Sequence, residues 1–202
     1  MSGNTNPQIR MKHRFDMVQD SQALFRLLLD ALANPGRLVN MADLAERFAA
    51  HGRWLAPAAV LLDNEIGFFW DGDQDLGEEI RFISGAAEVP PEEADFVFLS
   101  GPSLEKPAAF LSRIKQGSLL DPHDSALLLI AVSGKKEIEI SLKGPGIPPE
   151  GRRVEIGGEE ALWIRAREEQ GYEYPCGVEL VFLREDNSFW ALTRKAEAIW
   201  LM

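Results

Sequence analysis

The stretch Ala126-Leu127-Leu128-Leu129-Ile130-Ala131-Val132 decides the fold of this 202-residue chain. All of its residues are aliphatic, and a continuous apolar run of this length is typical of a strand that is covered on both faces. Upstream, Phe96-Val97-Phe98-Leu99 is a similar run that ends at Ser100-Gly101-Pro102. Downstream, Lys135 to Lys143 alternates apolar and polar residues, which predicts a half-exposed strand. A sheet is therefore expected at the centre of the molecule.

Helical patterns alternate with these predicted strands. The first helix is predicted to begin at Asp20 or Ser21 and to end at Asn34-Pro35-Gly36, and its apolar positions are Leu24, Phe25, Leu28, Leu29 and Leu32. Further helices are expected at 43–48, 57–62, 76–83, 107–114 and 159–169, and further strands at 66–70, 178–183 and 189–193. Proline at position 57 is expected in the first turn of its helix, where its missing N–H costs nothing. The pattern predicts an α/β fold with a mixed, largely buried sheet flanked by helices.

Length and composition predict one domain over residues 13–202, preceded by a loose segment over 1–12. The net charge is −11, and such a field repels nucleic acid and anionic membranes, so neither is an expected partner. The chain begins without the apolar stretch of a secretory signal, and its longest aliphatic run is far shorter than the roughly 20 residues that span a bilayer. With a single cysteine, these features predict a cytoplasmic protein.

The residue types that support catalysis or metal binding are scattered along the chain. His13, His51, His123 and Cys176 show no paired spacing of the kind that zinc sites use, so no metal is predicted. Cys176 lies between Pro175 and Gly177 without a neighbouring base, which favours a small buried hydrophobe over a nucleophile. We therefore predict no catalytic residue from the sequence alone.

The segment Lys143-Gly144-Pro145-Gly146-Ile147-Pro148-Pro149 suggests a phosphate-binding loop at first sight. Such a loop needs consecutive backbone N–H groups, and its three prolines have none. A rigid turn after the alternating strand is the favoured interpretation. Arg152 and Arg153 follow closely, and together with Lys143 they form a possible site for a carboxylate or a phosphate.

Several segments resemble the PhnH family, whose members are subunits of bacterial carbon–phosphorus lyase. Asp20 to Gly36, an arginine-containing apolar helix that ends at Pro35-Gly36, is similar to the opening signature of the family. Leu142 to Ile147 resembles a strand-ending turn with Gly144, Pro145 and Gly146, and Tyr174 to Phe182 resembles a later strand preceded by Pro175 and Gly177. Glu79 to Phe82 and Leu119 to Ala126 follow the same order and spacing, so the resemblance extends over residues 14–195.

The chain departs from the family pattern at a few positions. Ile83-Ser84 stands where relatives have His-Thr, and Cys176 and Glu179 replace a leucine and an aspartate. Thr193-Arg194-Lys195 differs from a common Pro-Arg-Thr ending. A role that needed the missing histidine would be lost here, whereas a scaffolding role tolerates such changes.

The resemblance implies a fold similar to that of type I pyridoxal-phosphate transferases, without the cofactor site. It also implies a complex with PhnG, PhnI, PhnJ and PhnK, and homodimers when those partners are missing. In that pathway the complex forms a ribose 1-phosphonate 5-triphosphate from a phosphonate and a nucleoside triphosphate. No cofactor is implied for this subunit.

Two functions remain open from the sequence. As a subunit without catalytic residues, the chain would bury apolar side chains against partners, with Trp54, Phe68, Phe69, Trp70, Trp163 and Trp200 as candidates and the protein's own core as their alternative place. As a separate enzyme or binding protein, it would surround an anionic, phosphorylated small molecule with Arg26, Arg81, Lys143, Arg152, Arg153 and Arg194.

Overall fold

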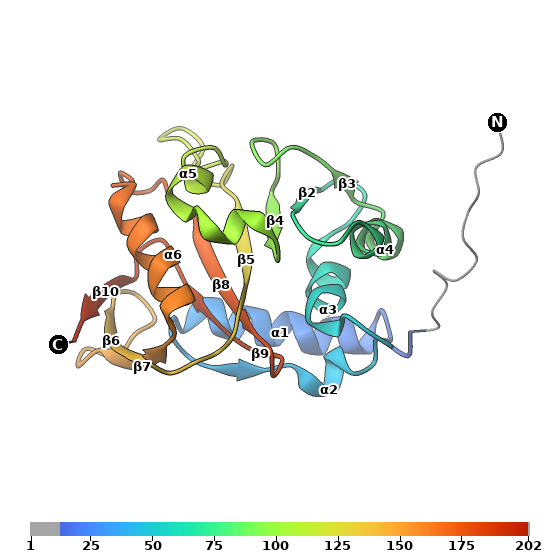
Figure 1. The fold of residues 1–202 in the computed structure, drawn as a ribbon, viewed down its shortest axis with the longest axis horizontal. Coiled ribbons are helices and arrows are strands. Elements are labelled where there is room, and N and C mark those ends of the chain that lie inside the picture. The colour runs from blue at the N-terminus through green and yellow to red at the C-terminus, as the bar shows by residue number, and fades with distance from the viewer. Residues whose placement is uncertain (1–12, 202) are drawn as a thin grey trace.

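The computed structural model describes residues 13–201, and the expected sheet lies at its centre (Figure 1). The predicted loose segment 1–12 lies outside the described residues. Seven strands are ordered β1-β9-β8-β5-β4-β2-β3. Their bounds are β1 Val39–Asn40, β2 Gly67–Trp70, β3 Ala87–Glu88, β4 Phe96–Leu99, β5 Leu127–Val132, β8 Glu179–Arg184 and β9 Ser188–Leu192. Strands β3, β2, β4, β5 and β8 run parallel, whereas β9 is antiparallel to both β8 and β1. The sheet is therefore mixed, as predicted.

A smaller antiparallel sheet lies beside the main one. It consists of β10 (Glu197–Trp200), β6 (Ile138–Lys143) and β7 (Arg152–Ile156), with β6 in the middle. Ile140 and Leu142 of β6 are buried, whereas Glu139 and Lys143 are exposed. This is the half-exposed strand that the alternating sequence predicts.

Helices cover both faces of the main sheet. One face packs against α1 (Gln19–Ala33), α2 (Ala42–Ala45), α3 (Gly52–Leu61) and α4 (Gln74–Ser84). The other packs against α5 (Pro107–Leu111), the short 3₁₀ helix η2 (Pro102–Glu105), α6 (Gly158–Glu169) and the small sheet. Successive residues of β5 alternate between these two cores, since Leu129 belongs to the first and Leu128 and Ile130 to the second. The chain is thus an α/β protein with helices flanking a sheet that is buried on both sides.

The helix expected at 43–48 ends at Ala45, and the first helix begins at Gln19 rather than after a cap at Asp20 or Ser21. Two further helix predictions also need correction. Pro57 lies inside α3 rather than in its first turn, because the helix begins at Gly52 and buries Trp54 and Leu55 as well. The helix expected at 107–114 ends at Leu111, where the hydroxyl of Ser112 donates a hydrogen bond to the carbonyl of Ala109 (2.9 Å). Such side-chain bonds compete with helix propagation. Burial of apolar side chains thus makes α3 longer than predicted, and the hydrogen bond of Ser112 makes α5 shorter.

The apolar candidates for partner contacts lie mostly in the protein's own core. Phe68 and the tryptophans at 54, 70 and 163 are buried, whereas Phe69 and Trp200 are partly buried. Conversely, Phe25 and Leu29 of α1 were expected on the packed face and are 46% and 48% exposed. In residues 13–201, no helix combines the length and apolarity needed to cross a membrane.

Candidate functional site

Three of the basic residues that the sequence singles out lie apart from one another. Arg26 is exposed on α1. Arg81 is exposed on α4, where it lies 3.9 Å from the Glu78 carboxylate and 3.7 Å from that of Glu88. Lys143 is exposed at the end of β6. Helix α4 and strand β6 lie toward opposite ends of the molecule (Figure 1), so these residues do not surround a common ligand.

The neighbouring arginines of β7 serve different contacts. Arg152 Nη1 donates to the carbonyls of Asn34 and Pro35, at 2.7 and 2.6 Å, and so binds the segment that follows α1. Arg153 is exposed and pairs with Glu139 at 3.3 Å. Successive residues of a strand point to opposite faces. The structure therefore does not gather Lys143 and these arginines into one anion site.

Arg194 ties together loops from distant parts of the chain. Its Nη1 donates to the carbonyls of Pro122 (2.8 Å) and Pro175 (3.1 Å), and its Nη2 donates to Ser125 Oγ (2.9 Å). Its Nε lies 3.4 Å from Glu179 Oε1. These bonds occupy most of its guanidinium N–H groups, so its first role is to hold the loops that precede β5 and β8.

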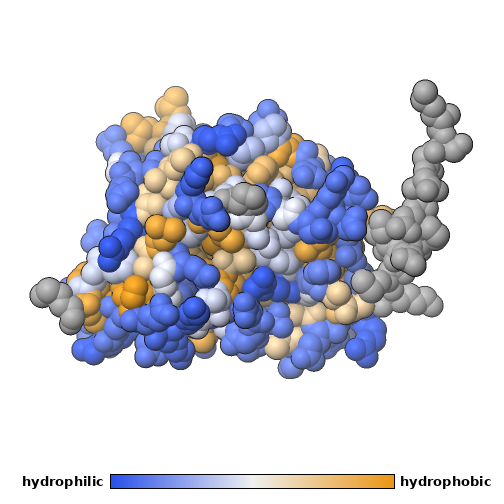
Figure 2. All heavy atoms as spheres, viewed as in Figure 1, coloured by the Kyte–Doolittle hydropathy of each residue, from blue (hydrophilic) through white to orange (hydrophobic). Residues whose placement is uncertain are grey.

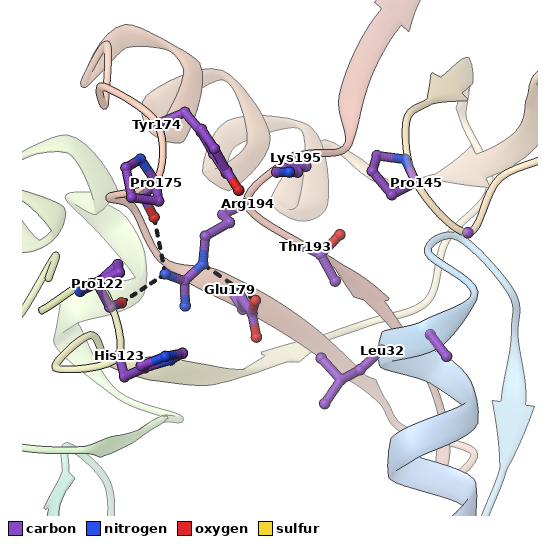
Figure 3. A pocket seen from close by; sticks show the side chains of 12 residues that line it. Leu32, Pro122, His123, Pro145, Tyr174, Pro175, Glu179, Thr193, Arg194 and Lys195 are labelled. Atoms are coloured by element: carbon purple, nitrogen blue, oxygen red, sulfur yellow. Dashed lines mark hydrogen bonds and ion pairs between the residues drawn. The ribbon is translucent and has the colours of Figure 1, made fainter. Parts of the chain in front are cut away.

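A pocket of about 530 Å³ opens beside Arg194 (Figure 3). We call it the amino-edge pocket, because β5 and β8 begin beside it and β9 ends there. Its lining consists of Leu32, Ala33, Pro122, His123, Pro145, Gly146, Tyr174, Pro175, Glu179, Thr193, Arg194 and Lys195. Segments that carry the family resemblance, spread from the end of α1 to the segment after β9, thus meet around one cavity.

Two glycines, Gly144 and Gly146, allow the turn after β6 to pack closely against the neighbouring segments of the pocket. A Cβ on Gly146 would lie 2.1 Å from the carbonyl oxygen of Ala33, and one on Gly144 would lie 2.6 Å from that of Lys195. Both glycines also have positive φ, +77° and +137°. The Gly-Pro-Gly turn therefore fits between the end of α1 and the segment after β9 only without side chains at these positions.

A second arginine, which the sequence did not single out, lies behind the pocket. Arg167 of α6 is 7% exposed and donates to the carbonyls of Val178 (3.3 Å), Thr193 (2.8 Å) and Ala196 (3.3 Å). Burial lowers the pKa of its guanidinium, and the neighbouring Tyr172 opposes that change. Burial in turn raises the pKa of Tyr172 to about 12. Arg167 follows the buried Trp163 and Ile164 at helical spacing, and this spacing was the only available sequence signal for it.

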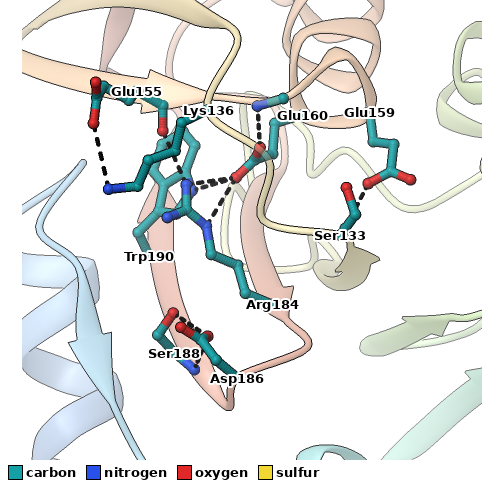
Figure 4. A network of polar contacts seen from close by, with 10 residues as sticks. Ser133, Lys136, Glu155, Glu159, Glu160, Arg184, Asp186, Ser188 and Trp190 are labelled. Carbon is teal, nitrogen blue, oxygen red and sulfur yellow. Dashed lines mark hydrogen bonds and ion pairs between the residues drawn. The ribbon is translucent and has the colours of Figure 1, made fainter.

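A buried polar network at the turn end of the β8–β9 hairpin was also missed (Figure 4). Glu160 is fully buried and accepts hydrogen bonds from Arg184 Nη2 (3.0 Å), Trp190 Nε1 (3.0 Å) and the backbone N–H of Gly157. Arg184 Nη2 also donates to the carbonyl of Glu155 (3.0 Å). Arg184 and Trp190 are 24 and 30 residues from Glu160 in sequence, so no local pattern indicates these two partners.

The carboxyl edge of the parallel strands, where α/β proteins usually bind ligands at the point of strand reversal, is occupied by a side chain. Asp71 follows β2 and accepts hydrogen bonds from the backbone N–H groups of Ser100 (3.0 Å), Gly101 (2.7 Å) and Ser103 (2.7 Å). A Cβ on Gly101 would lie 1.9 Å from the Asp71 carbonyl oxygen. The side chain of Asp71 thus binds the same backbone donors that would serve a ligand there.

Residue types suited to metals do not gather in the described structure. Within residues 13–201, no group of three or more His, Cys, Asp or Glu side chains is placed to hold an ion. Cys176, expected to be buried, is half-buried beside the amino-edge pocket residue Pro175. The pocket lining combines the cations Arg194 and Lys195 with the Glu179 carboxylate and with polar, aromatic and apolar side chains.

Comparison with known proteins identifies the family. The pattern of PhnH, described as a bacterial phosphonate metabolism protein, matches residues 13–198. The chain is also 29% identical over 163 residues to a protein of Stutzerimonas stutzeri described as "Putative C-P lyase subunit protein HtxG". The aligned residues make up 80% of this chain and 77% of that protein. The match spans every segment that lines the amino-edge pocket. The chain therefore belongs to the PhnH family of bacterial phosphonate metabolism proteins.

Proposed function

We propose that the chain is a subunit of a carbon–phosphorus lyase complex and has no catalytic residues of its own. In this role it helps companion subunits to form a ribose 1-phosphonate 5-triphosphate from a phosphonate and a nucleoside triphosphate. The observation that carries the proposal is the family match over residues 13–198, together with the description of the relative as a C–P lyase subunit. We expect PhnG, PhnI, PhnJ and PhnK as partners in the cytoplasm, and a homodimer when they are missing.

The surfaces that would meet these partners carry exposed apolar side chains. Leu119 and Leu120 are 64% and 99% exposed in the loop before β5. Apolar atoms gather at the upper left of the molecule, where that loop projects beside α5 (Figures 1 and 2). Phe25 and Leu29 lie one helical turn apart on α1 and expose a second apolar strip. Exposed apolar patches commonly mark protein–protein contacts, which supports the subunit role.

Co-purification tests the proposal directly. The full chain, tagged and co-expressed with the PhnG, PhnI, PhnJ and PhnK subunits of its own host, is expected to retain them through size-exclusion chromatography. Replacing both leucines of the loop, Leu119→Ser with Leu120→Ser, should reduce that retention without changing the thermal unfolding of the isolated chain. A chain that captures none of the subunits and supports lyase activity no better than an empty vector would refute the subunit role.

The fold is further proposed to resemble that of type I pyridoxal-phosphate transferases, without the cofactor site. A Schiff-base lysine needs a neutral amine, which a lowered pKa provides. In the described part of the chain, Lys115 is the only lysine that is not exposed, and hydrogen bonds from its ammonium to Asp95 and Asp124 raise its pKa. The purified chain mixed with pyridoxal phosphate should show no Schiff-base absorbance. A stable absorbance band that borohydride fixes to a lysine would contradict the proposal.

The alternative function, a separate enzyme or binding protein for a phosphorylated small molecule, has one observation in its favour. The amino-edge pocket has a volume typical of small-molecule sites, which run from about 300 to 1,000 Å³. Conversion of a phosphonate or a nucleotide by the isolated chain, without companion subunits, would favour this function over the subunit role.

A further inference from the structure

We propose that the amino-edge pocket binds the –PO₃ group of a small organic phosphonate or phosphate ester, with Lys195 as the cation that contacts it. The inference goes beyond the subunit role, because it assigns a ligand site to the subunit itself. It rests on the pocket and on membership of a phosphonate metabolism family, and it does not depend on which companion subunits bind.

The charge of the pocket is opposite to that of the protein. The chain carries a net charge of −11, yet the lining contains Arg194 and Lys195 against the single carboxylate of Glu179. That carboxylate already lies 3.4 Å from Arg194 Nε. Arg167 lies behind the pocket lining and donates its hydrogen bonds to backbone carbonyls rather than to a carboxylate. A local excess of positive charge in an acidic protein indicates an anionic ligand.

Lys195 is the group best able to contact that anion. Its ammonium is exposed and lies 4.0 Å from the ring centroid of Tyr174, which is itself 61% exposed. A cation–π contact at an exposed site is weak, so the ammonium can move from the ring to an oxyanion at little cost. Arg194 is a positioning residue, because its guanidinium holds the walls formed by Pro122 and Pro175.

The remaining donors come from different walls. His123 lies on the side of the pocket formed by the loop before β5, and Thr193 lies between Arg194 and the Gly-Pro-Gly turn (Figure 3). A tetrahedral –PO₃ group presents three acceptor oxygens in different directions, whereas a planar carboxylate presents only two oxygens. Leu32, Pro145 and the ring of Tyr174 leave apolar surface for an organic substituent. Both phosphonates and phosphate monoesters have this chemistry.

Isothermal titration calorimetry of the full-length chain at low ionic strength tests the site. The probes are methylphosphonate, methyl phosphate and acetate. We expect saturable binding of methylphosphonate, of methyl phosphate or of both, and much weaker binding of acetate. Whichever of the two phosphorus compounds binds more tightly shows whether the ligand is a phosphonate or a phosphate ester. Lys195→Met should weaken that binding by about tenfold or more, since a charge-assisted hydrogen bond is lost.

Two further variants separate a true site from general attraction. Lys136→Met removes the same charge from an exposed lysine that pairs with Glu155 elsewhere on the surface, and it should leave the affinity within about twofold. Ala33→Phe leaves every charge in place but fills the pocket from the exposed end of α1, and it should abolish binding. The proposal is overturned if neither phosphorus compound binds, if acetate binds as well, if both lysine variants weaken binding equally, or if the filled pocket still binds.

Discussion

The two ends of the β8–β9 hairpin each carry an arginine, and the two arginines are used differently. At the turn end, Arg184 is 5% exposed and pairs with the fully buried carboxylate of Glu160. At the open end, Arg194 binds loop carbonyls and faces a pocket. At the turn end, which we call the closed end, the arginine is buried and used within the protein, whereas the open end leaves polar groups available to a ligand. We therefore expect loss of the charged groups at the turn end to reduce mainly stability, and loss of the Lys195 charge at the open end to reduce mainly binding.

The largest expected effect is at the closed end. Glu160→Ala leaves Arg184 buried without its counter-charge and Trp190 Nε1 without its acceptor, so it should lower the free energy of unfolding by about 3–5 kcal/mol. Urea denaturation measures the change. Glu169→Ala, at an exposed position of the same helix, is the control and should stay within about 0.5 kcal/mol of wild type. A loss below about 1 kcal/mol for Glu160→Ala would show that the network is dispensable.

The next effect tests the close packing at the open end. Gly146→Ala combines a positive φ with a Cβ 2.1 Å from the carbonyl oxygen of Ala33, whereas Gly171 has a φ of +61° and open space around it. Gly171→Ala should cost about 1–2 kcal/mol for the backbone conformation alone. Gly146→Ala should cost clearly more, by about 1–3 kcal/mol for the overpacking. Equal losses in urea denaturation would mean that the turn shifts freely away from α1.

A smaller effect concerns alkaline pH, again at the open end. The pKa of Tyr172 is raised to about 12 in the folded chain by burial, against about 10 in an unfolded one. Below about pH 10 its contribution to stability is fully present, and it is lost as the pH rises toward about 12, because the unfolded state then releases a proton that the folded state retains.

Tyr172→Phe isolates this contribution. Within the described residues, Tyr172 Oη is buried without a hydrogen-bond partner, so its removal leaves no partner unpaired. The free energy of unfolding should fall less between about pH 9 and pH 11.5 in the variant than in wild type. Parallel pH dependence of the two proteins would show that the hydroxyl titrates in the folded chain as it does in the unfolded one.

The smallest expected effect sharpens the comparison most. Lys195→Met should change the free energy of unfolding by less than about 0.5 kcal/mol, because the ammonium is exposed and contacts only an exposed ring. Thermal unfolding at neutral pH measures it beside the binding titration. A substantial loss of stability would place Lys195 with the structural residues, and the two ends of the hairpin would then not differ as proposed.

Local sequence patterns were sufficient for most of the fold. The aliphatic run at 126–132 became β5, and the alternating residues after it became β6, because burial on two faces or on one face leaves different periodicities. The same patterns could not assign faces where the partner lies far away. Phe25 and Leu29 follow the helical repeat as well as Leu24 and Leu28 do, yet only the latter pair is buried.

The candidate site was predicted less well, because it depends on contacts between distant segments. Arg194 was selected with five other basic residues, and only the fold shows that it holds Pro122 and Pro175 beside a pocket while the others lie elsewhere. Lys195, Arg167 and Glu160 were not selected at all.

The sequence by itself determined the fold class, the order of most elements and the family resemblance, because hydrophobic period and turn residues act over a few neighbouring positions. Strands β1, β3, β7 and β10 were not predicted. Only the tertiary structure decided which charges are buried and which face a cavity. An ionisable side chain acquires its role from the groups around it, and here those groups lie up to 118 residues away from it in the chain, as the Asn34 carbonyl does from Arg152.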